Sequence, residues 1–325
     1  MTLVVFQKLL AILLTVGLGY VAGRARWLGD DQPMVARVVG NVAFTVFVPA
    51  LLFRTTARLD LSALPWRTVS AFFVPALAVL LASYRWQRRA RAQHGPAAGA
   101  VRALSTSFGN SVQLGIPFAA ALFGEAGLGI HIALVSLHAL VLLSVATTLA
   151  ELDIAHAHAE HAGTRSVVRT LGLTVRNTVL HPVILPVLAG LAWNFTGLGV
   201  HSVADEVLVM LSDAVVPVCL VLIGVTLAAY GVRGQVRAAV GITAVKLLAL
   251  PALVLLVAHW GFGLAGTPLA VVVMLGAMPV GSNALIFAQR YHAQQAEATA
   301  AIVFSTLAFM LSAPLWLSLL GALGA

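Results

Sequence analysis

Long apolar stretches, separated by short polar ones, make up almost the whole chain. A helix needs about 20 consecutive apolar residues to cross a bilayer. Ten stretches reach that length, with ends uncertain by about 2–4 residues. They are residues 3–23, 34–55, 66–86, 103–123, 128–150, 175–195, 205–229, 236–258, 267–289 and 297–321. The pattern predicts an all-α polytopic membrane protein with ten transmembrane helices.

Composition agrees with this prediction and excludes a soluble domain. Of the 325 residues, 60% are hydrophobic and 9% are charged, whereas soluble domains carry about 25% charged residues. The first stretch contains Lys8 but is long enough to span, so we expect a retained helix rather than a cleaved signal peptide. Cys219 is the single cysteine, which excludes an internal disulfide.

The arginines are divided unevenly between the two sets of loops. Those in or beside the odd-numbered loops are Arg24, Arg26, Arg37, Arg85, Arg88, Arg89, Arg91, Arg102, Arg165, Arg169, Arg176, Arg233, Arg237 and Arg290. The even-numbered loops hold Arg54, Arg58 and Arg67. Because basic loops stay in the cytoplasm, both termini are predicted to lie outside. The net charge of +8 therefore reflects topology, and no nucleic-acid partner is expected.

Two of the apolar stretches contain helix-breaking residues near their middle. Segment four holds Asn110, Gly115 and Pro117, and segment nine holds Pro279 and Gly281. A break at this depth frees backbone N–H and C=O groups that lipid cannot satisfy, so it must be buried or must line a watery cavity. One such break in each half of the chain is a sequence indication of a transporter's binding site.

The two halves correspond to each other in their landmarks. A shift of 168 residues places Pro49 on Pro217 and Gly115 on Asn283. Each half then holds five helices, and since five is odd, the second half enters the membrane from the opposite side. We expect a first repeat over 1–150, a cytoplasmic linker over 151–174 and a second, inverted repeat over 175–325.

The linker is rich in histidine and carboxylate side chains. These are Glu151, Asp153, His156, His158, Glu160 and His161. They could bind zinc or form a solvated polar linker with a short helix. We prefer the second interpretation because a mobile loop is a poor source of coordination geometry, and we expect neither a metal nor a cofactor.

Amide side chains beside the breaks are the first candidates for substrate contact. Asn110 precedes one break and Asn283 follows the other, and each amide offers donors and an acceptor. Either could instead cap its broken helix. Gln113 lies between Asn110 and Pro117, where it could line the site or satisfy freed backbone groups.

The prolines suggest the charge of the substrate. Proline is favoured at the first position of a helix, so Pro117 and Pro279 could each open the second half of a broken helix. The following N–H groups would then point into the gap with the positive end of the helix dipole. Two such ends favour an anion, most simply a carboxylate. The alternative is a kink that only shapes packing.

Three further polar residues fall at membrane depth, where charge is costly and commonly marks function. Lys246 could attract an anion or extend towards the cytoplasmic face. Asp213 could bind a proton or pair with Lys246. His138 could relay protons, although a hydrogen-bonded packing role is the preferred interpretation.

Several ordered motifs resemble the auxin efflux carrier family, which includes plant PIN-type auxin exporters and bacterial relatives proposed to move small carboxylates. The matching residues are Asn110, Gly115, Ile116 and Pro117, then Leu211 to Ala214 and Gly224, then Ala244, Val245 and Pro251, and finally Pro279, Gly281, Phe287, Ala288 and Tyr291. Lys246 stands where the plant proteins carry arginine. The resemblance implies ten helices built around two crossing broken helices, a location in the bacterial inner membrane, and a homodimer.

The chain also departs from the plant pattern. Ala284 stands where the plant proteins have a second proline, and residues 66–84 carry Arg67 as their one formal charge. No nucleotide, zinc-protease or nucleophile motif is present, so we expect no enzyme. We expect a secondary transporter, most simply an exporter, of small organic anions. The alternatives are a sodium- or proton-coupled symporter of the bile-acid type and, in another class, a channel or ligand-sensing receptor.

Overall fold

The computed structural model describes residues 3–58, 65–88, 95–112, 114–162, 180, 184–230 and 235–323. Within these ranges the protein is helical, without strands, and one isolated β-bridge is present. The helices are α1 (Leu3–Arg24), α2 (Gln32–Val42), α3 (Val48–Ala57), α4 (Trp66–Arg88), α6 (Ala98–Ser107), α7 (Gly115–Ala162), α9 (Ile184–Phe195), α10 (Ser202–Tyr230), α11 (Val236–Ala244), α12 (Leu250–Leu256), α13 (Gly266–Ala277), α14 (Asn283–Arg290) and α15 (Gln295–Ala322).

Short π-helical turns join some of these helices into longer rods. They are η1 (Ala43–Phe47), η2 (Val245–Ala249) and η3 (Val257–Gly261). Conversely, α7 is divided at Gly124, whose φ of 61° and ψ of −163° are not helical. A side chain is strained at this positive φ, which explains why glycine ends the predicted fourth segment.

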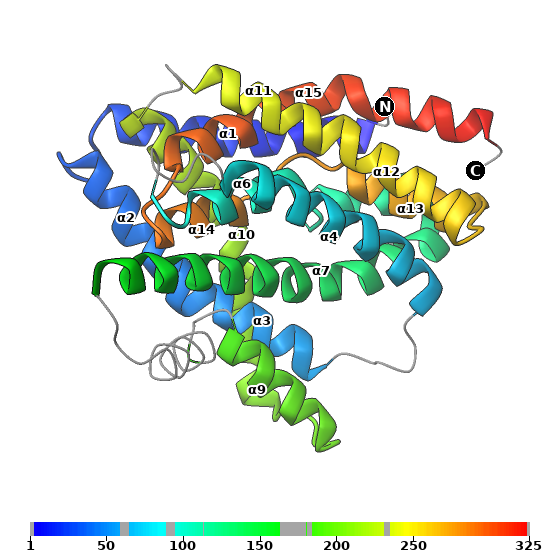
Figure 1. Cartoon of the computed structure of the whole chain (residues 1–325), viewed down its shortest axis with the longest axis horizontal. Helices are drawn as coiled ribbons and strands as arrows, with labels where there is room; N and C mark the ends of the chain where they lie inside the picture. Colours follow the sequence, from blue (N-terminus) through cyan, green and yellow to red (C-terminus); the bar gives the residue numbers. More distant parts are fainter. Residues whose placement is uncertain are drawn as a thin grey trace.

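Six helical rods of the described chain are long and apolar enough to cross a membrane. They are Gln32–Ala57, Trp66–Arg88, Ala126–Ala157, Ser202–Ala229, Val236–Gly261 and Gln295–Ala322. Two shorter apolar helices, α9 and α13, accompany them. Figure 1 shows both chain ends in the right half of the view, whereas the C-terminal end of α7 lies at the left.

Helices from the two halves of the chain pack against one another. The first helix, α1, lies along α10, and α3 lies along α9. The α1–α10 contact brings backbones together, because a side chain at Gly19 would overlap the carbonyl of Val221 and one at Gly224 would overlap that of Val16. Small residues at such positions allow the close approach that drives helix association in membranes.

The first part of the predicted linker continues the helix that precedes it. Helix α7 continues to Ala162, so residues 151–162 extend the fifth segment rather than leaving it. Asp153 on this extension is buried, and its Oδ1 lies 3.5 Å from Nε of Arg88. The remainder of the linker lies outside the described residues.

The most buried part of the molecule surrounds the two helix breaks, which are the non-helical segments between α6 and α7 and between α13 and α14. Every residue from 269 to 282 is buried, and so is nearly every residue from 97 to 111. Helices α6 and α13 therefore lead into the breaks from inside the bundle. This placement meets the requirement that irregular backbone at membrane depth be enclosed by protein.

Candidate functional site

The two helix breaks contact each other and are joined by backbone hydrogen bonds. The first separates α6 from α7, and the second separates α13 from α14. The backbone N–H of Asn110 donates to the carbonyl of Pro279 at 2.8 Å, and the N–H of Gly281 donates to that of Phe108 at 3.0 Å. These bonds flank an antiparallel bridge between Gly109 and Val280. Each break thus satisfies backbone groups of the other.

Side chains satisfy further backbone groups at the crossing. The N–H of Gly109 donates to Nε2 of His138 at 3.2 Å, and the N–H of Val280 donates to Oγ of Ser305 at 3.0 Å. An alanine methyl group at Gly281 would lie 2.7 Å from Phe108 Cδ1 and 2.8 Å from the Gly109 oxygen. The crossing therefore requires glycine at this position.

A cavity of about 360 Å³ opens beside the crossing. Its walls come from α3, α7, α10 and both breaks. The polar residues that line it are Arg54, Thr55, Thr56, Asn110, Ser111, Ser136, His138, Ser212, Asp213, Ser282 and Asn283. A second cavity of about 270 Å³, with mainly apolar walls from α1, α10 and α15, shares Asn110 and Ser282 with the first. The crossing thus separates two cavities.

The structure brings Asn110, Gly281 and Asn283 together, as three of the predicted contact residues, along the larger cavity. Asn110 is 8% exposed. The Oδ1 atom of Asn283 is buried and has no partner among the described residues. Because rotation of an amide exchanges its oxygen and nitrogen, this side chain can present a donor or an acceptor to a ligand.

The other predicted contact residues either do not line the larger cavity or lie outside the described residues. Gly115 begins α7 and donates its N–H to the carbonyl of Asn110 at 3.1 Å. Pro117 lies in the first turn of α7, as the third residue rather than the first. Pro279 lies within the second break, four residues before α14 begins, so it does not open that helix. Gln113 lies outside the described residues.

The expected free N–H groups at the two helix starts are largely bonded. In α14 the N–H of Ala284 donates to the carbonyl of Gly281, and that of Leu285 donates to Ser282, both at 3.0 Å. The start of α7 is closed in the same way by the N–H of Gly115. Asparagine, serine and arginine side chains, rather than a row of open backbone donors, therefore supply most of the polar surface of the cavity.

Lys246 does not line the cavity. It lies in η2 with no exposed surface, and its Nζ donates to the carbonyl of Gly276 at 2.5 Å. That carbonyl is near the C-terminal end of α13, where a positive charge complements the helix dipole. Of the two alternatives for Lys246, extension towards the cytoplasmic face does not agree with this burial, and Lys246 supports the half-helix leading into the second break.

Asp213 and His138 differ from each other in their setting. Asp213 has an exposed side chain that lines the larger cavity, and no ion pair links it to Lys246. The ring of His138 packs against Phe72 and Phe108, with centroids 5.7 and 4.6 Å away. Its Nε2 accepts from Gly109, so the proton resides on Nδ1. His138 thus accepts a backbone hydrogen bond and packs against aromatic rings, while its buried Nδ1 has no partner among the described residues.

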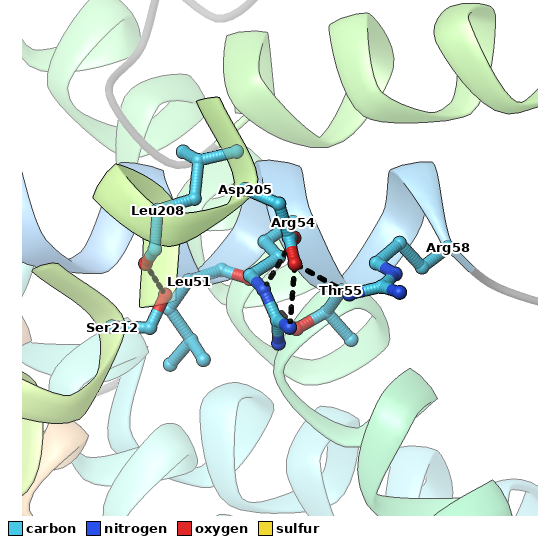
Figure 2. A network of polar contacts seen from close by, with 7 residues as sticks. All are labelled: Leu51, Arg54, Thr55, Arg58, Asp205, Leu208 and Ser212. Atoms are coloured by element: carbon cyan, nitrogen blue, oxygen red, sulfur yellow. Dashed lines mark hydrogen bonds and ion pairs between the residues drawn. The ribbon is translucent and has the colours of Figure 1, made fainter. Parts of the chain in front are cut away.

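One charged cluster at the mouth of the cavity was not predicted as part of the site. Arg54 donates from Nε to Oδ1 of Asp205 at 2.8 Å and from Nη2 to Oδ2 at 3.3 Å. Arg58 donates from Nη1 to the same Oδ2 at 2.8 Å. Figure 2 shows Arg54, from the last turn of α3, and Arg58, the residue that caps this helix, both reaching one carboxylate on α10. The sequence offered the i, i+4 spacing of the arginines, but not their shared partner.

Metal binding finds no support among the residues that the structure describes. They contain no group of three or more His, Cys, Asp or Glu side chains able to hold an ion. The side chains of His158, Glu160 and His161, which the sequence analysis named, lie outside this description.

Apolar helices of spanning length, two interrupted helices whose breaks bond to each other, and a cavity beside these breaks with polar and apolar lining are features expected of a membrane transporter. A family model described as "Membrane transport protein" matches residues 4–317. The chain belongs to this family, which confirms the resemblance to the auxin efflux carriers. Members of the family are transporters and not enzymes.

A relative from Methanothermobacter thermautotrophicus, described as an uncharacterized transporter, is 27% identical over 319 residues. The match covers 95% of this chain and 96% of the relative. The similarity therefore extends over both halves of the chain and over both helix breaks.

Proposed function

We propose that the protein is a secondary transporter that moves small organic anions by alternating access. The observation that carries this proposal is the cavity at the crossing, whose wall combines Asn110, Asn283 and Arg54. Amide and guanidinium groups donate hydrogen bonds to carboxylate oxygens, and Arg–carboxylate bonds are among the stronger ones. A volume of about 360 Å³ suits a small molecule.

The proposed architecture is ten transmembrane helices in two inverted repeats of five. Its support is the reciprocal packing of the halves. Segment one packs on segment seven through α1 and α10, and segment six packs on segment two through α9 and α3. An axis in the membrane plane that exchanges segments one and six, and two and seven, relates these two contacts.

We further propose export driven by the membrane potential. Moving one net charge is worth about 2.3 kcal/mol per 100 mV, and a negative cell interior drives an anion outward. We also propose that both termini lie outside, because the arginine distribution favours this topology.

Proton-coupled transport is the second candidate, because Asp213 lines the same cavity. A proton bound to this carboxylate would remove a charge that repels the substrate.

Asparagine substitutions in proteoliposomes test the proposed site. Carboxylates that raise the melting temperature of the purified protein are selected first, since a ligand stabilises the state that binds it. Loss of a hydrogen-bond partner for a buried carboxylate costs about 1–3 kcal/mol, so Asn110→Ala and Asn283→Ala should each weaken binding about 5- to 150-fold. Asn41→Ala, on an exposed face of α2, is the matched control.

The same vesicles separate the alternatives. Export that follows a potassium–valinomycin potential supports the uncoupled mechanism, whereas flux that requires a pH or sodium gradient supports a symporter. Unitary currents would indicate a channel, and binding without flux would indicate a receptor. Parental transport by both asparagine variants would refute the site.

A further inference from the structure

We propose that Arg54 is a direct contact for the transported anion and that Asp205 restrains it at the cavity mouth. This inference rests on the proposed function and adds a specificity-determining residue to it. Arg54 is the one cationic side chain among the described residues lining the larger cavity. Threonines and leucines of α3 flank it on the wall, so a carboxylate in the cavity has a guanidinium within the same space.

The charge of the cluster favours an anion. Two arginines share one carboxylate, so Arg54, Arg58 and Asp205 together retain one positive charge. The cluster lies where α3 ends and α10 begins, and Arg54 is its member that lines the cavity. A cation at the entrance of a low-dielectric cavity raises the local concentration of anions.

Arg54 also has hydrogen-bonding capacity to spare. Its guanidinium has five N–H donors, and Asp205 is its single partner among the described residues, through a short bond of 2.8 Å and a longer one of 3.3 Å. A substrate carboxylate can therefore bind the remaining donors, or take the place of the longer bond, while the shorter bond still positions the side chain. Arg58 continues to pair with Asp205 throughout.

Arg54 further compensates for the negative charge inside the cavity. Asp213 is the one carboxylate among the described lining residues. With Arg54 present the formal charges of the wall cancel, whereas without it the wall is net negative and repels an anion. This balance gives Arg54 a second reason to determine which ligands the cavity accepts.

Arg58 provides a matched control on the same helix. It lies one turn after Arg54 and touches the same carboxylate, yet it does not line the cavity, and its side chain is 54% exposed. Arg54→Gln and Arg58→Gln lower the charge of the cluster equally. A difference between them therefore reports direct contact, and an equal effect reports long-range attraction.

The test compares half-saturation concentrations for one carboxylate in proteoliposomes at low and high salt. Arg54→Gln should raise the value about tenfold or more, as expected for loss of a charge-assisted bond. Arg58→Gln should raise it less than about threefold, and high salt should abolish that difference because it screens exposed charges. Asp205→Asn, which releases Arg54, should lower the value.

Arg54→Lys guards against a folding defect, since it keeps the charge but loses the two-pronged geometry. It should melt like the parent protein and still raise the half-saturation concentration. Equal effects of Arg54→Gln and Arg58→Gln, or a parental value for Arg54→Lys, would overturn the inference while leaving anion transport intact. A parent protein that moves none of a panel of mono- and dicarboxylates would instead overturn the proposed function, and this inference with it.

Discussion

Replacing Gly281 by alanine should force apart the two helix breaks. The added methyl group would lie 2.7 Å from Phe108 Cδ1 and 2.8 Å from the Gly109 oxygen. Favourable carbon contacts begin near about 3.5 Å, so one break must move by roughly 0.7 Å. The phenyl ring can rotate away, but the backbone oxygen of Gly109 cannot move without the rest of its break.

The size of the effect follows from this displacement. Overpacking a filled core costs about 1–3 kcal/mol. The same movement stretches the bonds from Asn110 to Pro279 and from Gly281 to Phe108, each with a net value of about 1 kcal/mol. We expect a loss of about 2–4 kcal/mol in stability, together with weaker ligand binding, because Asn110 and Asn283 project from the displaced segments.

Two measurements on the purified protein check this expectation. The melting temperature should fall, and stabilisation by a carboxylate that binds the parent should shrink. Gly129→Ala is the control, because a methyl group there meets nothing within 4 Å and alanine favours a helix. A Gly281→Ala variant that melts and binds like the parent would show that the crossing tolerates separation.

Three further predictions concern other parts of the molecule. In a cysteine-free background, a membrane-impermeant maleimide should label Gly199→Cys in intact cells and Ala162→Cys only after permeabilisation; the opposite result would reverse the topology. Glu297→Gln should cost about 3 kcal/mol, because it removes the negative charge from a largely buried bidentate pair with bonds of 2.6 and 2.7 Å and leaves Arg102 with the neutral Gln87 as its remaining partner. Replacing both residues by methionine should recover much of that loss in a denaturation assay, and no recovery would contradict the argument. Lys246→Arg should lose about 1–3 kcal/mol, because a larger group must fit a site with no exposed surface; an unchanged melting temperature would refute this.

Hydrophobic length and helix breakers carried most of the predictable information. Apolar stretches determine where spanning helices can form, since their length must match the bilayer. Accordingly, α4 and α15 begin and end within two residues of the predicted segments. The breaks were also predictable, because glycine, proline and asparagine at membrane depth require a specific structural cause.

Contacts between distant segments were not predictable in the same way. The sequence could not indicate that the two breaks bond through Gly109 and Val280, because this pairing depends on their three-dimensional approach. It left the role of Lys246 open between two alternatives, because the direction of its side chain is set by the end of α13, 30 residues away. Arg54 was read from topology alone because its partner Asp205 lies 151 residues further along the chain.

The hydrogen bonds between the two helix breaks also restrict which parts of the protein can move relative to one another during transport. The two backbone bonds that form the bridge between Gly109 and Val280 hold the halves of the binding site together, so a hinge that ran between the repeats would break them in every cycle. A hinge that leaves them intact must instead run between the paired breaks and the cavity wall formed by α3 and α10, against which α9 and α1 pack. The substrate would then keep its contacts with Asn110 and Asn283 during the conformational change. It would exchange only the contacts made by that wall, including the one with Arg54.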